Sequence, residues 1–153
     1  MRQFSVALLL MMSPLLLCAA DPAVGIWNMN LAKSKYTPGP PPRSQTRIYV
    51  EEKAGLKAVV ITVYKDGNTE TVIYPATYDG KEHPVSGAPD RDGIVMTQID
   101  EYTAESILTH AGVKIGEARR TVSRDGRTMT VTYKGVSNGE TVNNTAVYEK
   151  VPD

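Results

Sequence analysis

Short turn signals divide most of this chain into segments of similar length. Asp-Gly dipeptides, which favour tight turns between antiparallel strands, stand at 66–67, 79–80, 92–93 and 125–126. Between the turns, Val, Ile and Thr are abundant and make up 38 of the 133 residues from Asp21 onward, a stretch with three Leu and no Phe. These β-branched residues favour strands. The chain is therefore predicted to be all-β and not a helical bundle.

Nine strands are predicted from these segments. Their ranges are about 24–30, 45–52, 56–65, 69–78, 93–100, 103–110, 113–123, 127–135 and 141–150. Met129, Val131 and Tyr133 alternate with threonines, as they would in a strand with one buried face. Short, regularly spaced strands with close turns are typical of an antiparallel sandwich or barrel.

Several segments depart from this regular pattern. Pro75 lies inside a strand pattern, which predicts an edge strand or a bulge there. Residues 79–92 are too long for an ordinary hairpin loop, so we expect them to cover something or to bridge a gap in the sheet. The proline-rich residues 37–44 predict a stiff extended connector, and residues 31–36 have room for one short helical turn.

The first twenty residues have the order of a secretory signal peptide. Arg2 supplies a positive charge, residues 6–17 are almost wholly apolar, and Cys18-Ala19-Ala20 follows with small residues, as at a cleavage site. Cleavage there would leave Asp21 as the first residue of a mature domain of residues 21–153. We expect export to the periplasm or to the outside of the cell.

Two alternatives exist for this first segment. A membrane anchor needs about 20 apolar residues, whereas this run is shorter and is interrupted by Ser13 and Pro14. Lipid attachment at Cys18, as in bacterial lipoproteins, usually follows a small residue, and Leu17 stands there instead. We therefore expect no stable membrane insertion after cleavage and no lipid anchor through Cys18.

Charge and reactive residues argue against several function classes. The 17 Lys and Arg balance the 17 Asp and Glu, so no nucleic-acid partner is expected. Residues 21–153 contain no Cys, which excludes a thiol nucleophile there. His83 and His110 have no companions at a metal-like spacing, whereas a catalytic zinc usually needs three protein ligands. We predict no catalytic residue, no metal and no cofactor, and expect that the protein is not an enzyme.

Two short motifs stand at the ends of the predicted sheet. Gly25-Ile26-Trp27 opens the first strand, and Val147-Tyr148-Glu149-Lys150 ends the last. This arrangement resembles the calycins, which include lipocalins and fatty-acid-binding proteins. The resemblance implies a single antiparallel up-and-down β-barrel of about 8–10 strands. Residues 27–36 also resemble the opening of a group of short exported bacterial proteins of unassigned function.

The calycin resemblance implies roles for particular residues. Gly25 and Trp27 would be structural, and the indole would pack against an arginine from a late strand, here Arg119 or Arg120, in a cation–π contact. Fatty-acid-binding proteins also carry a helical lid and an arginine two residues before a tyrosine on the last strand. The lid has no counterpart here, and Ala146 replaces that arginine.

A candidate ligand site follows from the predicted barrel. Val and Thr fill space less well than Leu and Phe, so a barrel of this size could keep a cavity. The residues predicted to line it are Tyr64, Tyr74, Tyr133, Asn144 and Tyr148. Because Ala146 supplies no cation, we expect a neutral or weakly polar lipophilic small molecule. In the alternative hypothesis the same tyrosines are core residues, the barrel is solid, and the protein is a structural or protein-interaction module whose partner the sequence does not name.

Overall fold

The computed structural model describes residues 19–153. Most of the predicted signal peptide, including Cys18, lies outside these residues. Within them, no helix is long and apolar enough to cross a bilayer.

Eleven β-strands and one 3-10 turn occupy the described part of the chain. The strands are β1 (Gly25–Met29), β2 (Lys35–Thr37), β3 (Ser44–Glu52), β4 (Gly55–Val63), β5 (Thr69–Ala76), β6 (Glu82–Pro84), β7 (Gly93–Asp100), β8 (Thr103–His110), β9 (Val113–Val122), β10 (Thr128–Ser137) and β11 (Glu140–Lys150). The 3-10 turn η1 spans Leu31–Lys33. Nine strands match the nine predicted segments. The two additional ones, β2 and β6, have three residues each, and β6 lies in the segment predicted to be a loop.

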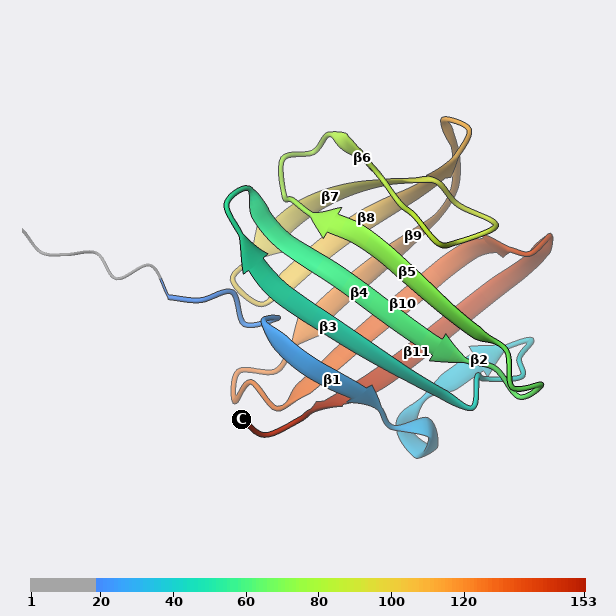
Figure 1. Ribbon diagram of the computed structural model, residues 1–153, viewed down its shortest axis with the longest axis horizontal. Helices are drawn as coiled ribbons and strands as arrows, with labels where there is room; N and C mark the ends of the chain where they lie inside the picture. The colour runs from blue at the N-terminus through green and yellow to red at the C-terminus, as the bar shows by residue number, and fades with distance from the viewer. Residues whose placement is uncertain (1–18) are drawn as a thin grey trace, which may run out of the picture.

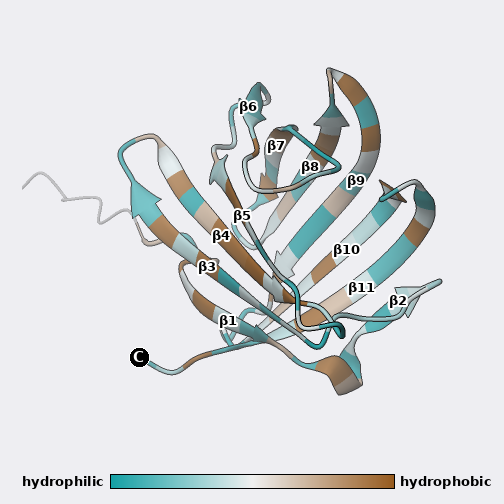
Figure 2. Cartoon of the chain, turned by 45° about the vertical axis from the view of Figure 1, so that its right-hand side comes forward, coloured by the Kyte–Doolittle hydropathy of each residue, from teal (hydrophilic) through white to brown (hydrophobic). Residues whose placement is uncertain are grey.

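The strands form one antiparallel sheet that curls into a nearly closed barrel (Figure 1). The main path runs β5-β4-β3-β1-β11-β10-β9-β8-β7-β6, and β2 pairs with β11. β1 joins the two halves of the chain because it pairs with both β3 and β11. β5, which contains Pro75, stands at one end of this path, as the proline predicted. Figure 2 shows apolar and polar residues alternating along the long strands, which gives the barrel an inner and an outer face.

β5 and β6 stand at the two ends of the sheet, and the loop that follows β6 bridges the gap between them. Two backbone hydrogen bonds, of 2.9 and 3.0 Å, join Ile73 of β5 to Ser86 of this loop. Gly87 follows with a φ of +84°, and a Cβ atom there would lie 1.9 Å from the carbonyl oxygen of Thr71. Only glycine permits this close approach. The long segment between β5 and β7 therefore bridges a gap in the sheet, which is one of the two roles that its length predicted.

Apolar side chains plug the barrel at the end where the described chain begins. Trp27 is fully buried in one apolar core cluster with Ala23, Val122 and Met129. The indole Nε1 of Trp27 donates a hydrogen bond of 2.8 Å to the carbonyl oxygen of Ala23. The indole is thereby both closely packed and hydrogen-bonded. Trp27, Ala23, Val122 and Met129 are together called the plug below.

The cation beside Trp27 is not the one that the calycin resemblance implied. Lys150, the register partner of Trp27 on β11, places its Nζ 5.6 Å from the centroid of the indole ring. Arg120 instead points into the barrel, and Arg119 points outward, where its Nη1 lies 2.6 Å from Oε1 of Glu105. The expected pairing of Trp27 with either arginine is therefore wrong, because Lys150 already covers the ring.

Gly25 allows this lysine to reach the indole. Its φ is +130°, and a Cβ atom there would lie 2.6 Å from Cε of Lys150. A larger residue at position 25 would displace the lysine stem. Glycine in the Gly-x-Trp motif thus serves the packing of Lys150 on Trp27.

Candidate ligand-binding cavity

A cavity of about 330 Å³ occupies the barrel interior. Its wall is made by side chains at alternate positions of β3, β4, β5, β7, β8, β9, β10 and β11. It extends from the plug side to the opposite end, where the β4–β5 turn, the β10–β11 turn, the prolines at 40 and 42 and the loop before β7 meet. This opposite end is called the loop end. The cavity disfavours the solid interior of the alternative hypothesis.

All five tyrosine and asparagine residues predicted from the sequence lie on the cavity wall. They are Tyr64, Tyr74, Tyr133, Asn144 and Tyr148. Alternation along β10 and β11 placed Tyr133, Asn144 and Tyr148 correctly, because every second residue of a strand faces the same side. That they contact a ligand stays a prediction.

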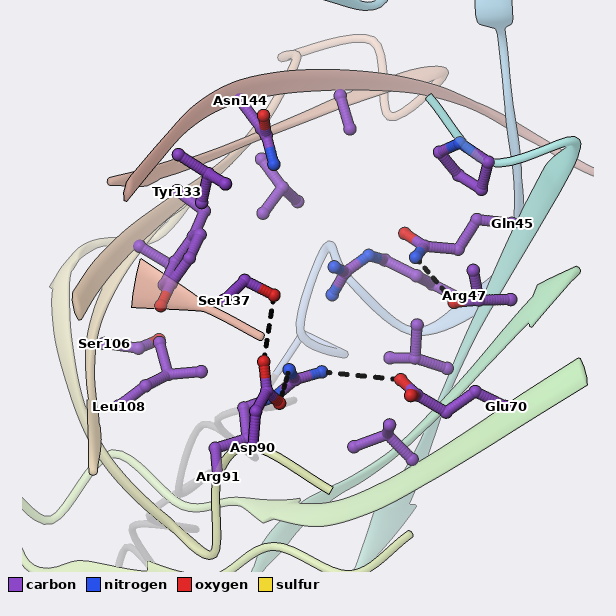
Figure 3. Close-up of a pocket in the computed structure, with 18 of the residues that line it drawn as sticks. Gln45, Arg47, Glu70, Asp90, Arg91, Ser106, Leu108, Tyr133, Ser137 and Asn144 are labelled. Carbon is purple, nitrogen blue, oxygen red and sulfur yellow. Dashed lines mark hydrogen bonds and ion pairs between the residues drawn. The ribbon is translucent and has the colours of Figure 1, made fainter. Parts of the chain in front are cut away.

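Hydrogen bonds hold three of these side chains in place. The hydroxyl of Tyr148 donates to Oε1 of Gln45. The hydroxyl of Tyr133 donates to the carbonyl oxygen of Val136 at 2.8 Å. Oδ1 of Asn144 accepts the backbone N–H of Thr37 at 3.1 Å, and Figure 3 shows the Asn144 amide directed toward the cavity.

Tyr133 also explains a glycine on the neighbouring strand. A Cβ atom on Gly116 of β9 would lie 2.5 Å from the Tyr133 hydroxyl oxygen. The ring therefore packs directly on the backbone of Gly116. The register between β8 and β9 shifts beside this glycine, between Leu108 and Thr109, which matches the bulge expected of a glycine inside a strand.

Arg47 of β3 brings a positive charge to the cavity wall. Its Nη1 donates a hydrogen bond of 3.3 Å to the hydroxyl of Tyr49, and its Cζ lies 5.2 Å from the ring centroid of Tyr148. Its side-chain contacts are thus with tyrosines rather than with carboxylates. The buried Nε has no hydrogen-bond partner. Figure 3 shows the guanidinium pointing into the cavity.

Arg120 of β9 brings a second positive charge. Only 8% of the residue is exposed. Its Cζ lies 4.9 Å from the ring centroid of Tyr49 and 5.7 Å from that of Tyr78, whose hydroxyl accepts a hydrogen bond from Nη2. The nearest carboxylate oxygen, Oδ1 of Asp21, is 4.0 Å from Nη2. Nε and Nη1 have no partner.

The two arginines change the acidity of the tyrosine between them. Burial by itself raises the pKa of Tyr49, but the charges of Arg47 and Arg120 outweigh burial and lower that pKa to about 8. Burial raises the pKa of Tyr74 and of Tyr148. Tyr49 is therefore the tyrosine of this group that ionises most readily.

This positive charge corrects the expectation of a neutral interior. The absence of a cation was inferred from Ala146 alone, and Ala146 does line the cavity. The structure instead supplies the charge from β3 and β9, which the last strand cannot reveal. Period-two alternation could have predicted these inward arginines. Arg47 lies two residues before the buried Tyr49, and Arg120 lies two residues before the buried Val122, so each pair faces the same side of its strand. The choice left open between Arg119 and Arg120 is also settled, with Arg120 inside.

A cluster of charged and polar residues stands at the loop end of the cavity. Nη1 of Arg91 lies 2.8 Å from Oδ1 of Asp90, and its Nη2 lies 3.9 Å from Oε1 of Glu70 on β5. Oδ2 of Asp90 accepts hydrogen bonds from Oγ of Ser137 at 2.9 Å and from the backbone N–H of Asn138 at 3.2 Å. In Figure 3, dashed lines link Ser137 to Asp90, Asp90 to Arg91 and Arg91 to Glu70. The cluster ties the loop before β7 to β5 and to the β10–β11 turn.

The histidines lie away from the cavity wall. His83 Nε2 is 2.9 Å from a carboxylate oxygen of Asp79, and His110 Nδ1 is 3.8 Å from one of Asp92. Across residues 19–153, no three His, Cys, Asp or Glu side chains come together as ligands of a metal ion would.

Comparison with known proteins identifies the fold. No protein-family model matches the chain, and no curated protein sequence matches it. Among solved structures, the fold is similar to zebrafish ileal bile acid-binding protein complexed with cholic acid. The two share 12% sequence identity with a TM-score of 0.54, and the match covers 85% of this chain and 99% of that one. The predicted calycin-like barrel is therefore confirmed.

Proposed function

We propose that this chain is an exported, non-catalytic binding protein that holds a lipophilic small molecule with an acidic group inside its barrel. The observation that carries the proposal is the pair Arg47 and Arg120, which both line one cavity and which together have three buried nitrogen atoms without hydrogen-bond partners. Valine, leucine and isoleucine side chains of the same wall offer apolar surface to the rest of such a ligand.

The physical reason is the cost of an uncompensated charge. A buried guanidinium that leaves some of its N–H groups unpaired is unfavourable, because those groups have lost water and gained no hydrogen bond in return. Arginine stays protonated in proteins, so these two groups cannot escape the cost by neutralisation. A carboxylate or sulfonate in the cavity would accept the free N–H groups in charge-assisted hydrogen bonds.

The structural neighbour supports a lipophilic acid as the ligand class. It is a bile acid-binding protein that holds cholic acid, a molecule with both apolar and polar surface. The proposal revises the expected ligand from neutral to acidic and keeps its place in the interior.

The test is a titration with anilinonaphthalene sulfonate, a dye with an apolar body and an acidic group whose emission rises in apolar surroundings. Arg47→Gln and Arg120→Gln should each weaken its binding roughly 10- to 100-fold, the loss expected of a charge-assisted hydrogen bond. Arg119→Gln is the matched control, since its side chain pairs with Glu105 on the outer face. Wild-type affinity in both interior variants would refute the proposal.

Native mass spectrometry of protein purified from its own host is the second measurement. It should detect a copurified acid in the wild-type chain and lose it in the two interior variants. Thermal unfolding of each variant separates loss of the ligand from loss of the fold.

A further inference from the structure

The cavity wall is polar at two separate levels. The inner level, on the plug side, consists of Arg47, Tyr49, Tyr74, Arg120 and Tyr148, and the outer level, at the loop end, consists of Glu70, Asp90, Arg91, Ser137 and Asn144. β5 passes through both levels, with Tyr74 at the inner level and Glu70 at the outer level. β11 does the same with Tyr148 and Asn144. The number of residues between them on each strand therefore gives the distance between the two levels.

The apolar wall between the two levels is short. On β5 the inward residue between Tyr74 and Glu70 is Val72, and on β11 the one between Tyr148 and Asn144 is Ala146. Four residues of a strand rise about 13 Å, and the tilt of strands in a barrel makes the separation along the axis smaller. The apolar zone is thus only one inward residue deep on these strands.

We propose that the cavity selects a compact acid that carries a second, uncharged hydrogen-bonding group, such as a hydroxyl, roughly 10–13 Å from the acidic group. This inference rests on the proposed function, because the inner arginines hold the acidic group. The second group lies at the loop end, beside the amide of Asn144.

The charges at the loop end exclude a second acid. Arg91 is shared by two carboxylates, those of Asp90 and Glu70, so this level carries an excess of negative charge. A second carboxylate there would be repelled, whereas a hydroxyl can donate to a carboxylate and accept from an amide. The polarity of the loop end therefore favours an uncharged group.

The same level disfavours a plain alkyl end. A methyl terminus placed beside Glu70, Asp90 and Asn144 would strip water from these groups and offer no hydrogen bond in return. Asn144 is the clearest donor, because its Oδ1 is already occupied by the N–H of Thr37. Its amide nitrogen is left to face the cavity (Figure 3).

The experiment compares decanoic acid with its ω-hydroxy derivative by calorimetry on the purified protein. The two acids share the head group and the chain length. The hydroxy acid should bind roughly fivefold more tightly, the net effect of one hydrogen bond, although its extra hydroxyl favours water. Asn144→Leu should abolish this preference, by weakening binding of the hydroxy acid and by tightening binding of decanoic acid, whose alkyl end would no longer desolvate an amide.

Asn143→Leu is the matched control, since Asn143 is exposed on the outer face of the same strand and its substitution should leave the preference intact. Equal or tighter binding of decanoic acid by the wild-type chain would overturn this inference and leave the proposed function standing. Binding of neither acid would also overturn it, and the dye titration of the arginine variants then decides the proposed function separately.

Discussion

The guanidinium of Arg120 and the carboxylate of Asp21 are joined through one tyrosine hydroxyl. Tyr78 donates to Oδ2 of Asp21 at 2.8 Å and accepts from Nη2 of Arg120, while Nη2 and Oδ1 of Asp21 are 4.0 Å apart. Asp21 is also the first residue after the predicted cleavage site. The start of the mature chain would therefore take part in the electrostatics of the cavity.

Asp21→Asn should remove the carboxylate nearest to Arg120. We expect the free energy of unfolding to fall by about 1–3 kcal/mol, because a buried donor loses its charged partner. Binding of the sulfonate dye should become tighter, because the cavity gains net positive charge. Urea unfolding and dye titration measure the two effects. Glu117→Gln is the control, since its pair with Lys114 is exposed and should contribute little.

Processing at Asp21 is a prediction of its own. Intact-mass measurement of the exported protein should give a chain that begins at Asp21, as the charged start, short apolar run and small residues indicate. A full-length, membrane-embedded chain would contradict it. Addition of a diacylglycerol to Cys18 would instead support the lipoprotein alternative.

Trp27→Ala should destabilise the barrel strongly. The indole is fully buried in the plug and donates to Ala23, so its removal should cost about 3–5 kcal/mol. Chemical unfolding measures the loss, and the emission of wild-type Trp27 should lie toward the blue before unfolding. Ile26→Ala, at an adjacent position that is 45% exposed, should change stability far less. Similar losses in the two variants would mean that Trp27 is not part of a packed plug.

Gly87→Ala should loosen the loop that bridges β5 and β6. The added Cβ atom would lie 1.9 Å from the carbonyl oxygen of Thr71. Gly67→Ala is the control, because the φ of Gly67, +89°, is close to the +84° of Gly87, and a Cβ atom on Gly67 would have nothing within 4 Å. Both substitutions strain a left-handed residue. The loss of unfolding free energy should therefore be greater in Gly87→Ala than in Gly67→Ala, and the difference measures the collision. Equal losses in the two variants would show that the loop moves to accommodate the added Cβ atom at no cost.

The stability of the barrel should rise and then fall between neutral and strongly alkaline pH. The pKa of Tyr49 is about 8 in the folded chain, below the ordinary value of 10.0. Between these values the unfolded chain binds a proton that the folded chain has lost, so stability increases with pH. Burial raises the pKa of Tyr78 to about 12 and that of Tyr74 further, so above pH 10 the folded chain retains protons and stability decreases.

Urea unfolding at a series of pH values tests this profile, and the ultraviolet absorbance of tyrosinate reports the ionisation itself. Tyr49→Phe should remove the rise and keep the alkaline fall. A wild-type profile that is flat from pH 8 to 10 would show that the arginines do not act on Tyr49 as the structure indicates.

Local sequence determined the strands, the turns and the two faces of the sheet. Asp-Gly turns and β-branched segments act over a few residues, so nine strands and the edge position of Pro75 could be predicted without the fold. Alternation likewise placed Tyr133, Asn144 and Tyr148 on the inner wall, because the side chains of a strand face opposite sides in turn. The short strands β2 and β6 escaped prediction, since three residues carry too little pattern.

Tertiary structure alone decided which inward side chains meet. Arg47, Tyr49 and Arg120 belong to strands far apart in the chain, and only closure of the sheet brings them to one cavity. The partner of Trp27 was decided in the same way, by the pairing of β1 with β11 that delivers Lys150. Period-two patterns specify the face of a residue but not its neighbours across the barrel, because those depend on strand order and register. The charge of the cavity is therefore a property of the closed barrel rather than of any one strand.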